Sequence, residues 1–278
     1  MSASRLGPIT CVTIRTPSLA MTEEMYGRYL GYRTVGRAVL SPQHEQLWGI
    51  AGLAGIPTLL MAPEAANDFV FRFVEAPADP DYQAFTRHGW QAAELIVARV
   101  DPLADRLANS PFEIVAPPMD LSFCPDIRAM QIRGPGGEIL YLTEFKKPVP
   151  GLDAPPARCA VDRTFIVIVG GPSLPAMQRY FSEHFGVPET PAMESRVQTM
   201  ALAFGLSREH RFRIAALPLR DRCYIEADEM PAEALPLPVT PRELAPGISM
   251  VSFHGAAVAA ISSVRGAAGE LIEVVTAA

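Results

Sequence analysis

The chain has 278 residues, of which 49% are apolar and 19% charged, so it can bury a large core and disorder is not expected. Its net charge of −6 excludes the broad basic surface that duplex nucleic acid requires. No apolar run is long enough for a membrane helix, the N-terminal residues lack a signal-peptide core, and the four cysteines form no CxxC pair. We therefore expect a cytoplasmic protein with free thiols that binds neither membranes nor nucleic acid.

Several common catalytic motifs are missing from the sequence. It contains no GxGxxG, GxxxxGKS/T, HExxH or GxSxG pattern, and its only lysines, Lys146 and Lys147, are adjacent in a proline-rich stretch. The sequence therefore gives no support to a nucleotide-binding enzyme, a zinc protease, a serine hydrolase or a Schiff-base enzyme.

The first predicted unit is a strand, a helix and further strands. Alternating apolar residues at 9–14 predict a strand, and Ser18 starts an amphipathic helix that ends at Gly31, which suits a left-handed cap. Further strands are predicted at residues 44–50, 57–61 and 68–74.

The second predicted unit has the same order of elements. Residues 93–100 predict a strand, and Asp101 caps a helix that has Pro102 at its first position. Strands follow at residues 112–115, 127–132 and 139–145.

The rest of the chain repeats these two units. Residues 146–158 are rich in proline and predict a semi-rigid linker. After it, Ser173 and Gly186 match Ser18 and Gly31 at an offset of 155 residues. Gly269-Glu270 matches Gly137-Glu138 at an offset of only 132, so the fourth unit lacks about 23 residues, the length of a helix and one strand.

Four such βαβββ modules resemble the vicinal oxygen chelate superfamily (glyoxalases, bleomycin-resistance proteins and type I extradiol dioxygenases). The local marks are the strand–Pro-Ser–helix–YLGY opening at residues 12–32 and the GPGGEILYL hairpin at 134–142. The resemblance covers nearly the whole chain. It implies an α+β fold of four modules, the fourth shortened, paired into two cup-like half-barrel domains. We therefore predict an N-terminal domain at residues 1–145 with modules 1 and 2 and the active cup, a linker at 146–158, and a C-terminal domain at 159–278.

The resemblance also implies where metal ligands would lie, because members of this superfamily usually hold a metal with histidines on first strands and glutamates on last strands. Counting from the helix caps places these positions on Cys11, Phe71, Glu94 and Tyr141 in the first cup and on Ile166, Glu226, Ser249 and Glu273 in the second. None is histidine, so we expect no metal cofactor. The alternative is a rescued site for Fe, Mn, Zn or Ni built from Glu226, His254 and Glu273.

Glu94 is the strongest candidate for catalysis, because it interrupts the apolar strand AAELIVARV. Burial would raise its pKa toward neutrality and make it a general base or acid, unless it is exposed or paired with Arg15 or Arg133. Tyr141 would face it and stabilise an oxyanion, and Arg15 would orient the substrate. The other substrate-binding candidates are Thr13, Cys11, Trp48 and Phe71, although Cys11 also fits a buried core thiol and the aromatic residues also fit plain packing.

The leading functional hypothesis is a metal-independent lyase, isomerase or (de)hydratase that acts on a small apolar or aromatic carbonyl compound. A non-catalytic small-molecule-binding protein of the resistance type is the first alternative. A glyoxalase-like or dioxygenase-like metalloenzyme with substituted ligands is the second. A monomer and a homodimer are equally compatible with the sequence.

Overall fold

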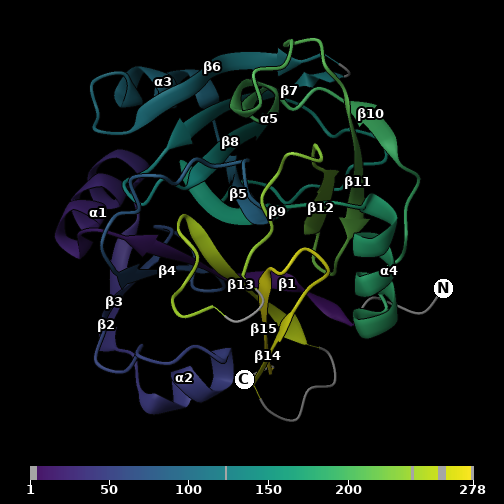
Figure 1. Ribbon diagram of the computed structural model, residues 1–278. Helices are drawn as coiled ribbons and strands as arrows, with labels where there is room; N and C mark the ends of the chain where they lie inside the picture. The colour runs from purple at the N-terminus through teal and green to yellow at the C-terminus, as the bar shows by residue number, and fades with distance from the viewer. Residues whose placement is uncertain (1–4, 123, 239–240, 256–260, 277–278) are drawn as a thin grey trace.

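The computed structural model describes residues 5–122, 124–238, 241–255 and 261–276 of the chain, and within them it forms two β-sheets (Figure 1). The seven-stranded sheet has the strand order β14-β15-β13-β1-β4-β3-β2. The eight-stranded sheet has the order β10-β11-β12-β9-β5-β8-β7-β6. This confirms the predicted mixed α+β fold with two curled sheets.

The elements follow one another as four modules. Module 1 comprises β1 (Leu6–Thr16), α1 (Leu19–Met25), the π-helical turn η1 (Tyr26–Leu30), β2 (Arg33–Val39), α2 (Pro42–Trp48), β3 (Pro57–Ala62) and β4 (Val70–Glu75). Module 2 comprises β5 (Gly89–Val97), α3 (Val100–Leu107), β6 (Glu113–Leu121), β7 (Cys124–Arg133) and β8 (Ile139–Phe145). Module 3 comprises β9 (Val161–Gly171), α4 (Leu174–Phe185), β10 (Met193–Ser195), α5 (Gln198–Ala203), β11 (Phe212–Pro218) and β12 (Tyr224–Glu229). Module 4 has β13 (Ile248–Gly255), β14 (Ser262–Arg265) and β15 (Leu271–Val275) and, in its described residues, no helix.

The repeated helix signals act as the sequence predicts. The Ser18 and Ser173 hydroxyls accept hydrogen bonds from main-chain N–H groups of the first turns of α1 and α4. Gly31 and Gly186 end the two helical segments with φ values of 75° and 63°, a conformation that glycine adopts without a Cβ clash.

The prediction of a strand at residues 44–50 is wrong, because this stretch belongs to α2 and the turn after it. Ser41 and His44 form a capping box, and Pro42 occupies the first helical turn, where its missing N–H costs nothing. The start of α3 also differs by two residues, since Arg99 rather than Asp101 is the N-cap.

The modules pair in a different order from the one we expected. β1 of module 1 runs antiparallel to β13 of module 4, and β5 of module 2 runs antiparallel to β9 of module 3. The two cups are therefore built from modules 1 and 4 and from modules 2 and 3, and not from residues 1–145 and 159–278 separately. The repeat identifies the modules, but it does not specify which of their first strands pair, because the first strand of every module has an equivalent edge free for pairing.

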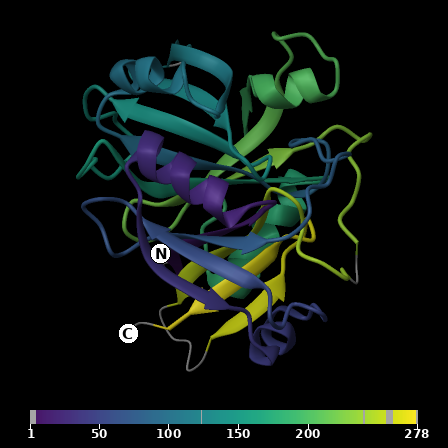
Figure 2. The same cartoon turned by 90° about the vertical axis from the view of Figure 1, so that its left-hand side faces the viewer.

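The main core lies between the two sheets, with α1 and α4 packed at opposite sides of it (Figures 1 and 2). The concave faces point away from this core. α2 covers that of the seven-stranded sheet, at the bottom of Figure 1, and α5 covers that of the eight-stranded sheet, at the top. No helix in the described parts of the chain is long and apolar enough to cross a membrane.

Candidate functional site

The concave face of the eight-stranded sheet brings four of the counted positions together. Glu94 on β5 lies opposite Tyr141 on β8 and, on the other side, opposite Ile166 on β9. On β12, Tyr224 lies opposite Ile166, so Glu226 follows on the same face two residues later. We call this concave surface the acidic cup. Glu94 and Tyr141 are neighbours in it, as predicted.

Glu94 meets the conditions for a proton-transfer group. It is half-buried, in contrast to the fully buried Leu95 beside it on the opposite face of β5. Burial raises the pKa of Glu94 to about 7, although a 2.7 Å hydrogen bond donated by the Thr143 hydroxyl opposes the rise. The arginines that could have neutralised Glu94 are engaged elsewhere, because Arg15 pairs with Glu243 and Arg133 with Glu113.

Glu226 and Asp228 form a second acidic pair in the same cup. Alternation along β12 points both side chains to the concave face, and Asp228 is 0% exposed. Burial raises the pKa of both carboxyls, and their mutual repulsion raises that of Glu226 further. Neither carboxyl oxygen of Asp228 has a hydrogen-bond partner within the described chain.

Tyr141 and α5 complete the acidic cup. Burial, together with the nearby Glu226, Asp228 and Glu94, raises the pKa of the Tyr141 phenol, so it remains a hydrogen-bond donor at neutral pH. Thr199 of α5 donates to Gln131 on β7. Apolar side chains of α5 and of nearby loops pack around one end of the cup: Phe85, Val197, Met200, Ala201 and Met230. The other end has the apolar side chains of Ile96, Phe165 and Ile166.

The concave face of the seven-stranded sheet holds a different and internally balanced set of polar groups. The Glu273 carboxylate accepts hydrogen bonds from the Trp48 indole N–H (2.9 Å) and the Ser252 hydroxyl (2.6 Å). It also pairs with Arg72 at 3.3 Å, and the Arg72 guanidinium lies 5.3 Å from the centre of the Trp48 ring. Arg72 and Glu273 neutralise each other, and the Trp48 side chain lies against both, so the protein itself fills this concave face. We call it the closed cup.

Cys11 and Thr13 lie in this closed cup. Thr13 accepts a long hydrogen bond from Arg72 (3.4 Å), and the Cys11 sulfur lies 3.9 Å from the Thr13 hydroxyl. Burial raises the pKa of the Cys11 thiol, which disfavours the thiolate that a nucleophile would need.

The count from the helix cap was wrong by one residue for Phe71. β4 pairs in parallel with β1 so that Phe71 lies opposite Val12, and both face the core. The Phe71 ring is fully buried against Tyr26, Tyr32 and other aromatic rings. Arg72 takes the place in the cup that we had assigned to Phe71.

Arg15 lies on the seven-stranded sheet, away from the acidic cup. It is on β1, and its guanidinium donates to the main-chain oxygens of Leu244 (3.1 Å) and Pro77 (2.8 Å) at a cleft of about 160 Å³. It therefore does not reach Glu94 and Tyr141, which belong to the other sheet.

The alternative metal site is divided between the two sheets. Glu226 lies on β12 of the eight-stranded sheet, whereas His254 and Glu273 lie on β13 and β15 of the seven-stranded sheet. The Nδ1 atom of His254 is 3.2 Å from the Arg220 guanidinium. These three residues cannot bind one ion.

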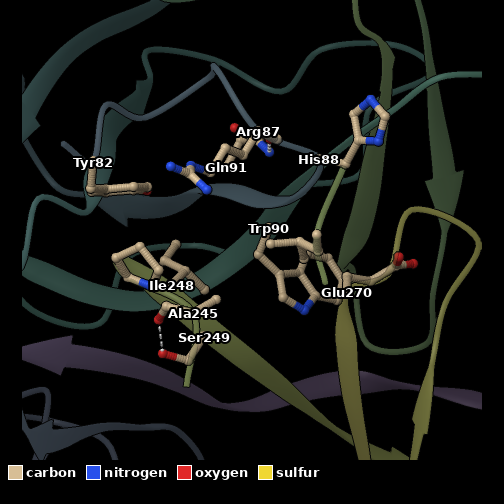
Figure 3. Close-up of a pocket in the computed structure, with 11 residues that line it drawn as sticks. Tyr82, Arg87, His88, Trp90, Gln91, Ala245, Ile248, Ser249 and Glu270 are labelled. Atoms are coloured by element: carbon tan, nitrogen blue, oxygen red, sulfur yellow. Dashed lines mark hydrogen bonds between the residues drawn. The ribbon is translucent and has the colours of Figure 1, made fainter. Parts of the chain in front are cut away.

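A small depression lies where the start of β5 approaches the start of β13 (Figure 3). The Gln91 side chain is satisfied by main-chain groups of Phe85, Arg87 and Gly89, and the Ser249 hydroxyl donates to Ala245. These contacts join loops to strands, so we assign the depression a structural role.

Comparison with known proteins supports the architecture. No protein-family profile and no curated protein sequence matches the chain. Glyoxalase I from Zea mays superposes with a TM-score of 0.64 at 12% identity, covering 96% of this chain and 92% of that one. A putative dioxygenase from Bacillus subtilis gives a TM-score of 0.63 at 12% identity over 99% and 86% of the two chains.

The chain has the vicinal oxygen chelate fold. This fold implies a metal between first and last strands, but the residues at those positions do not fit the usual histidine and glutamate set. The acidic cup offers Glu94, Tyr141, Ile166 and Glu226, which include an apolar side chain and no imidazole. In the closed cup, the Arg72 cation already occupies the Glu273 carboxylate. The described residues contain no group of three or more His, Cys, Asp or Glu side chains placed to bind a metal.

Sequence reasoning missed Asp228 and Arg72. Both lie on last strands of modules, and correct alternation along β12 from Glu226 would have placed Asp228 in the cup. Arg72 was missed because Phe71 and its aromatic neighbours, Phe69 and Phe73, hid the true phase of β4.

Proposed function

We propose that the protein is a metal-independent lyase, isomerase or (de)hydratase that works by acid–base chemistry in the acidic cup. The observation that carries the proposal is the pair of Glu94 and Tyr141, which lie opposite each other on adjacent strands. A carboxyl with a pKa of about 7 is half ionised near neutral pH and can both accept and return a proton. Perturbed carboxyls of this kind cluster at functional sites.

The chemistry that suits this pair is removal of a proton from the carbon next to a carbonyl group. The Glu94 carboxylate takes the proton, and the electron pair of the broken C–H bond moves to the carbonyl oxygen to give an enolate. The Tyr141 hydroxyl donates a hydrogen bond to that oxygen. If Glu94 then returns the proton to another carbon, the substrate is isomerised. If Glu94 instead gives the proton to a group that departs as the enolate collapses, the reaction is an elimination.

The walls of the acidic cup favour an apolar substrate. Ile96, Phe165 and Ile166 form an apolar cluster beside Glu94, and the apolar groups around α5 flank the other end. Such walls exclude water, which strengthens the hydrogen bond to the enolate. We therefore propose a small apolar or aromatic carbonyl compound as the substrate.

The test is hydrogen–deuterium exchange at the carbon next to the carbonyl of simple aryl ketones, such as acetophenone, followed by NMR in heavy water. Glu94→Gln should slow the catalysed exchange by about 10²- to 10⁴-fold, the range for loss of a general base. Tyr141→Phe should slow it by about 10²-fold or more. Glu138→Gln is the matched control, since burial also raises the pKa of Glu138 to about 7, but this residue is fully buried against Tyr26 outside the cup.

A non-catalytic ligand-binding protein is the second candidate, and the packing of α5 over the acidic cup favours it. In that case, Glu94→Gln would leave ligand affinity nearly unchanged and no exchange above the solvent rate would occur with the unaltered protein. Exchange that depends on Glu94 would exclude this candidate.

The proposed setting is the cytoplasm. All four cysteines are free thiols, which suits a reducing compartment. The proposed partner is a small molecule, bound by a monomer or a homodimer.

A further inference from the structure

We propose that Glu226 and Asp228 bind a positively charged nitrogen group of the ligand, so that the substrate is a carbonyl compound that carries an ammonium group. This inference rests on the proposed function in one respect: Glu94 and Tyr141 act on the carbonyl end, while Glu226 and Asp228 hold the charged end. It adds a charge requirement to the apolar substrate proposed above.

The first observation is that Asp228 lacks a partner. Its side chain is 0% exposed, and neither carboxyl oxygen accepts a hydrogen bond from any described residue. Buried carboxyls are normally paired or multiply hydrogen-bonded, because desolvation is otherwise uncompensated. Asp228 interacts electrostatically with Glu226 and Tyr141, so it belongs to the cup and not to a separate part of the core.

The second observation comes from the internal repeat. Glu226 and Glu273 lie on the last strands of modules 3 and 4, each on the concave face of its own sheet. Glu273 is neutralised by Arg72 and hydrogen-bonded by Trp48 and Ser252. In the described residues, no arginine, lysine or histidine plays that part for Glu226, so the acidic cup has the carboxyls without the cation that would hold them ionised.

An organic cation fits this site better than a metal ion. The neighbouring ligand position is occupied by Ile166, and the described residues do not bring three acidic or imidazole side chains into a metal-binding arrangement. Ile168 and Ile214, opposite Glu226 and Asp228 on adjacent strands, provide an apolar surround. A group with N–H donors on a hydrocarbon body satisfies both the carboxyls and these walls.

The cover of this site has few polar anchors. α5 has only six residues, and its N-cap, Val197, provides no side-chain hydrogen bond to the helix. The hydrogen bond of Thr199 to Gln131 is a polar tie to the sheet. A short helix held chiefly by apolar contacts can be displaced by a ligand at modest cost.

The experiment compares benzylammonium with benzyl alcohol, which has the same ring without the charge, by isothermal titration calorimetry in neutral buffer. We expect the unaltered protein to bind benzylammonium at least about tenfold more tightly than benzyl alcohol. Asp228→Asn and Glu226→Gln should each weaken benzylammonium binding by about tenfold or more. Glu270→Gln is the matched control, because Glu270 is also buried with an unpartnered oxygen, Oε1, but lies outside the cup.

Three outcomes would overturn the inference: equal binding of the two probes, unchanged benzylammonium binding in folded Asp228→Asn, or preferential binding of Mg²⁺ over benzylammonium. Circular dichroism establishes that each variant is folded. Glu94→Gln separates this inference from the proposed function. If that variant leaves ketone exchange unchanged while Asp228→Asn still weakens benzylammonium binding, the catalytic proposal fails and the charge-binding site stands. If Glu94→Gln stops exchange and Asp228→Asn leaves binding unchanged, the reverse holds.

Discussion

Tyr26 and Glu138 form a buried hydrogen bond between modules 1 and 2, and replacing Tyr26 by phenylalanine should weaken the fold in a pH-dependent way. The Tyr26 hydroxyl donates to Oε1 of Glu138 over 2.7 Å, and both residues are 0% exposed. Tyr26→Phe therefore leaves a carboxyl oxygen without this partner where water does not reach it.

The size of the effect depends on the charge of the carboxyl. Burial raises the pKa of Glu138 to about 7, and the hydrogen bond from Tyr26 opposes that rise. Because the folded-state pKa exceeds the unfolded value near 4.5, the stability that the protonated carboxyl provides is lost as the pH rises from about 4.5 to 7. Without Tyr26 the pKa of Glu138 in the folded protein rises further, so in the variant this loss continues to higher pH. We expect the free energy of unfolding to fall by about 1 kcal/mol below pH 7 and by about 2–3 kcal/mol above it.

The assay is urea denaturation on either side of pH 7, with Tyr32→Phe as the control. The Tyr32 hydroxyl donates to the main-chain oxygen of Asp162 over 2.7 Å, and that acceptor does not titrate. Tyr32→Phe should therefore cost about the same free energy at both pH values. An equal loss for Tyr26→Phe at both pH values, or no loss, would refute the reasoning.

Three further predictions concern the repeat, metal content and the closed cup. In the repeat, Phe181 corresponds to Tyr26 and Glu270 corresponds to Glu138, but Oε1 of Glu270 lacks a partner. Phe181→Tyr adds the hydroxyl that would donate to this oxygen, so it should raise the free energy of unfolding by about 1 kcal/mol in urea titrations. Destabilisation would show that the two positions are not equivalent. Elemental mass spectrometry of protein purified without chelators or a histidine tag should find no stoichiometric metal; stoichiometric iron, manganese, nickel or zinc would contradict the metal-independent proposal. Arg72→Met leaves the buried Glu273 carboxylate without its cation, so it should lower the free energy of unfolding by about 3 kcal/mol and change the fluorescence of Trp48. Unchanged stability would mean that the ion pair does not hold the closed cup together.

Local signals in the sequence were enough to predict the modules. Ser18, Gly31 and their repeats at Ser173 and Gly186 each set a helix boundary through a cap that depends on one residue. The shortened fourth module was also predictable, because the two Gly-Glu hairpins are 132 residues apart whereas the two helix caps are 155 residues apart.

The pairing of the modules could not be read in the same way. Whether β5 joins β9 depends on contacts between residues more than 60 positions apart, such as Glu94 with Ile166, and both faces of these strands are apolar enough to be buried. The sequence therefore identified Glu94 and Tyr141 as neighbours within one module, but it assigned Glu226 to the wrong partners.

The phase of a strand was the other limit. Phe71 and Phe73 in β4, with Phe69 just before it, have the period-two spacing of side chains on one face of a strand, but the spacing does not say which face. The register with β1 and their burial show that these rings point into the core. An error of one residue in the count placed the apolar Phe71 in the closed cup where the structure has the cation of Arg72, so the ion pair with Glu273 was not predicted.

The most direct test of the account is the pKa of the Glu94 carboxyl, measured by ¹³C NMR of glutamate-labelled protein with Glu94→Gln to assign the signal. We predict a pKa of about 7, raised by burial in the acidic cup. A value near the ordinary 4.5 would mean that the carboxyl is solvated and fully ionised at neutral pH, and it would contradict the assignment of Glu94 as a poised base.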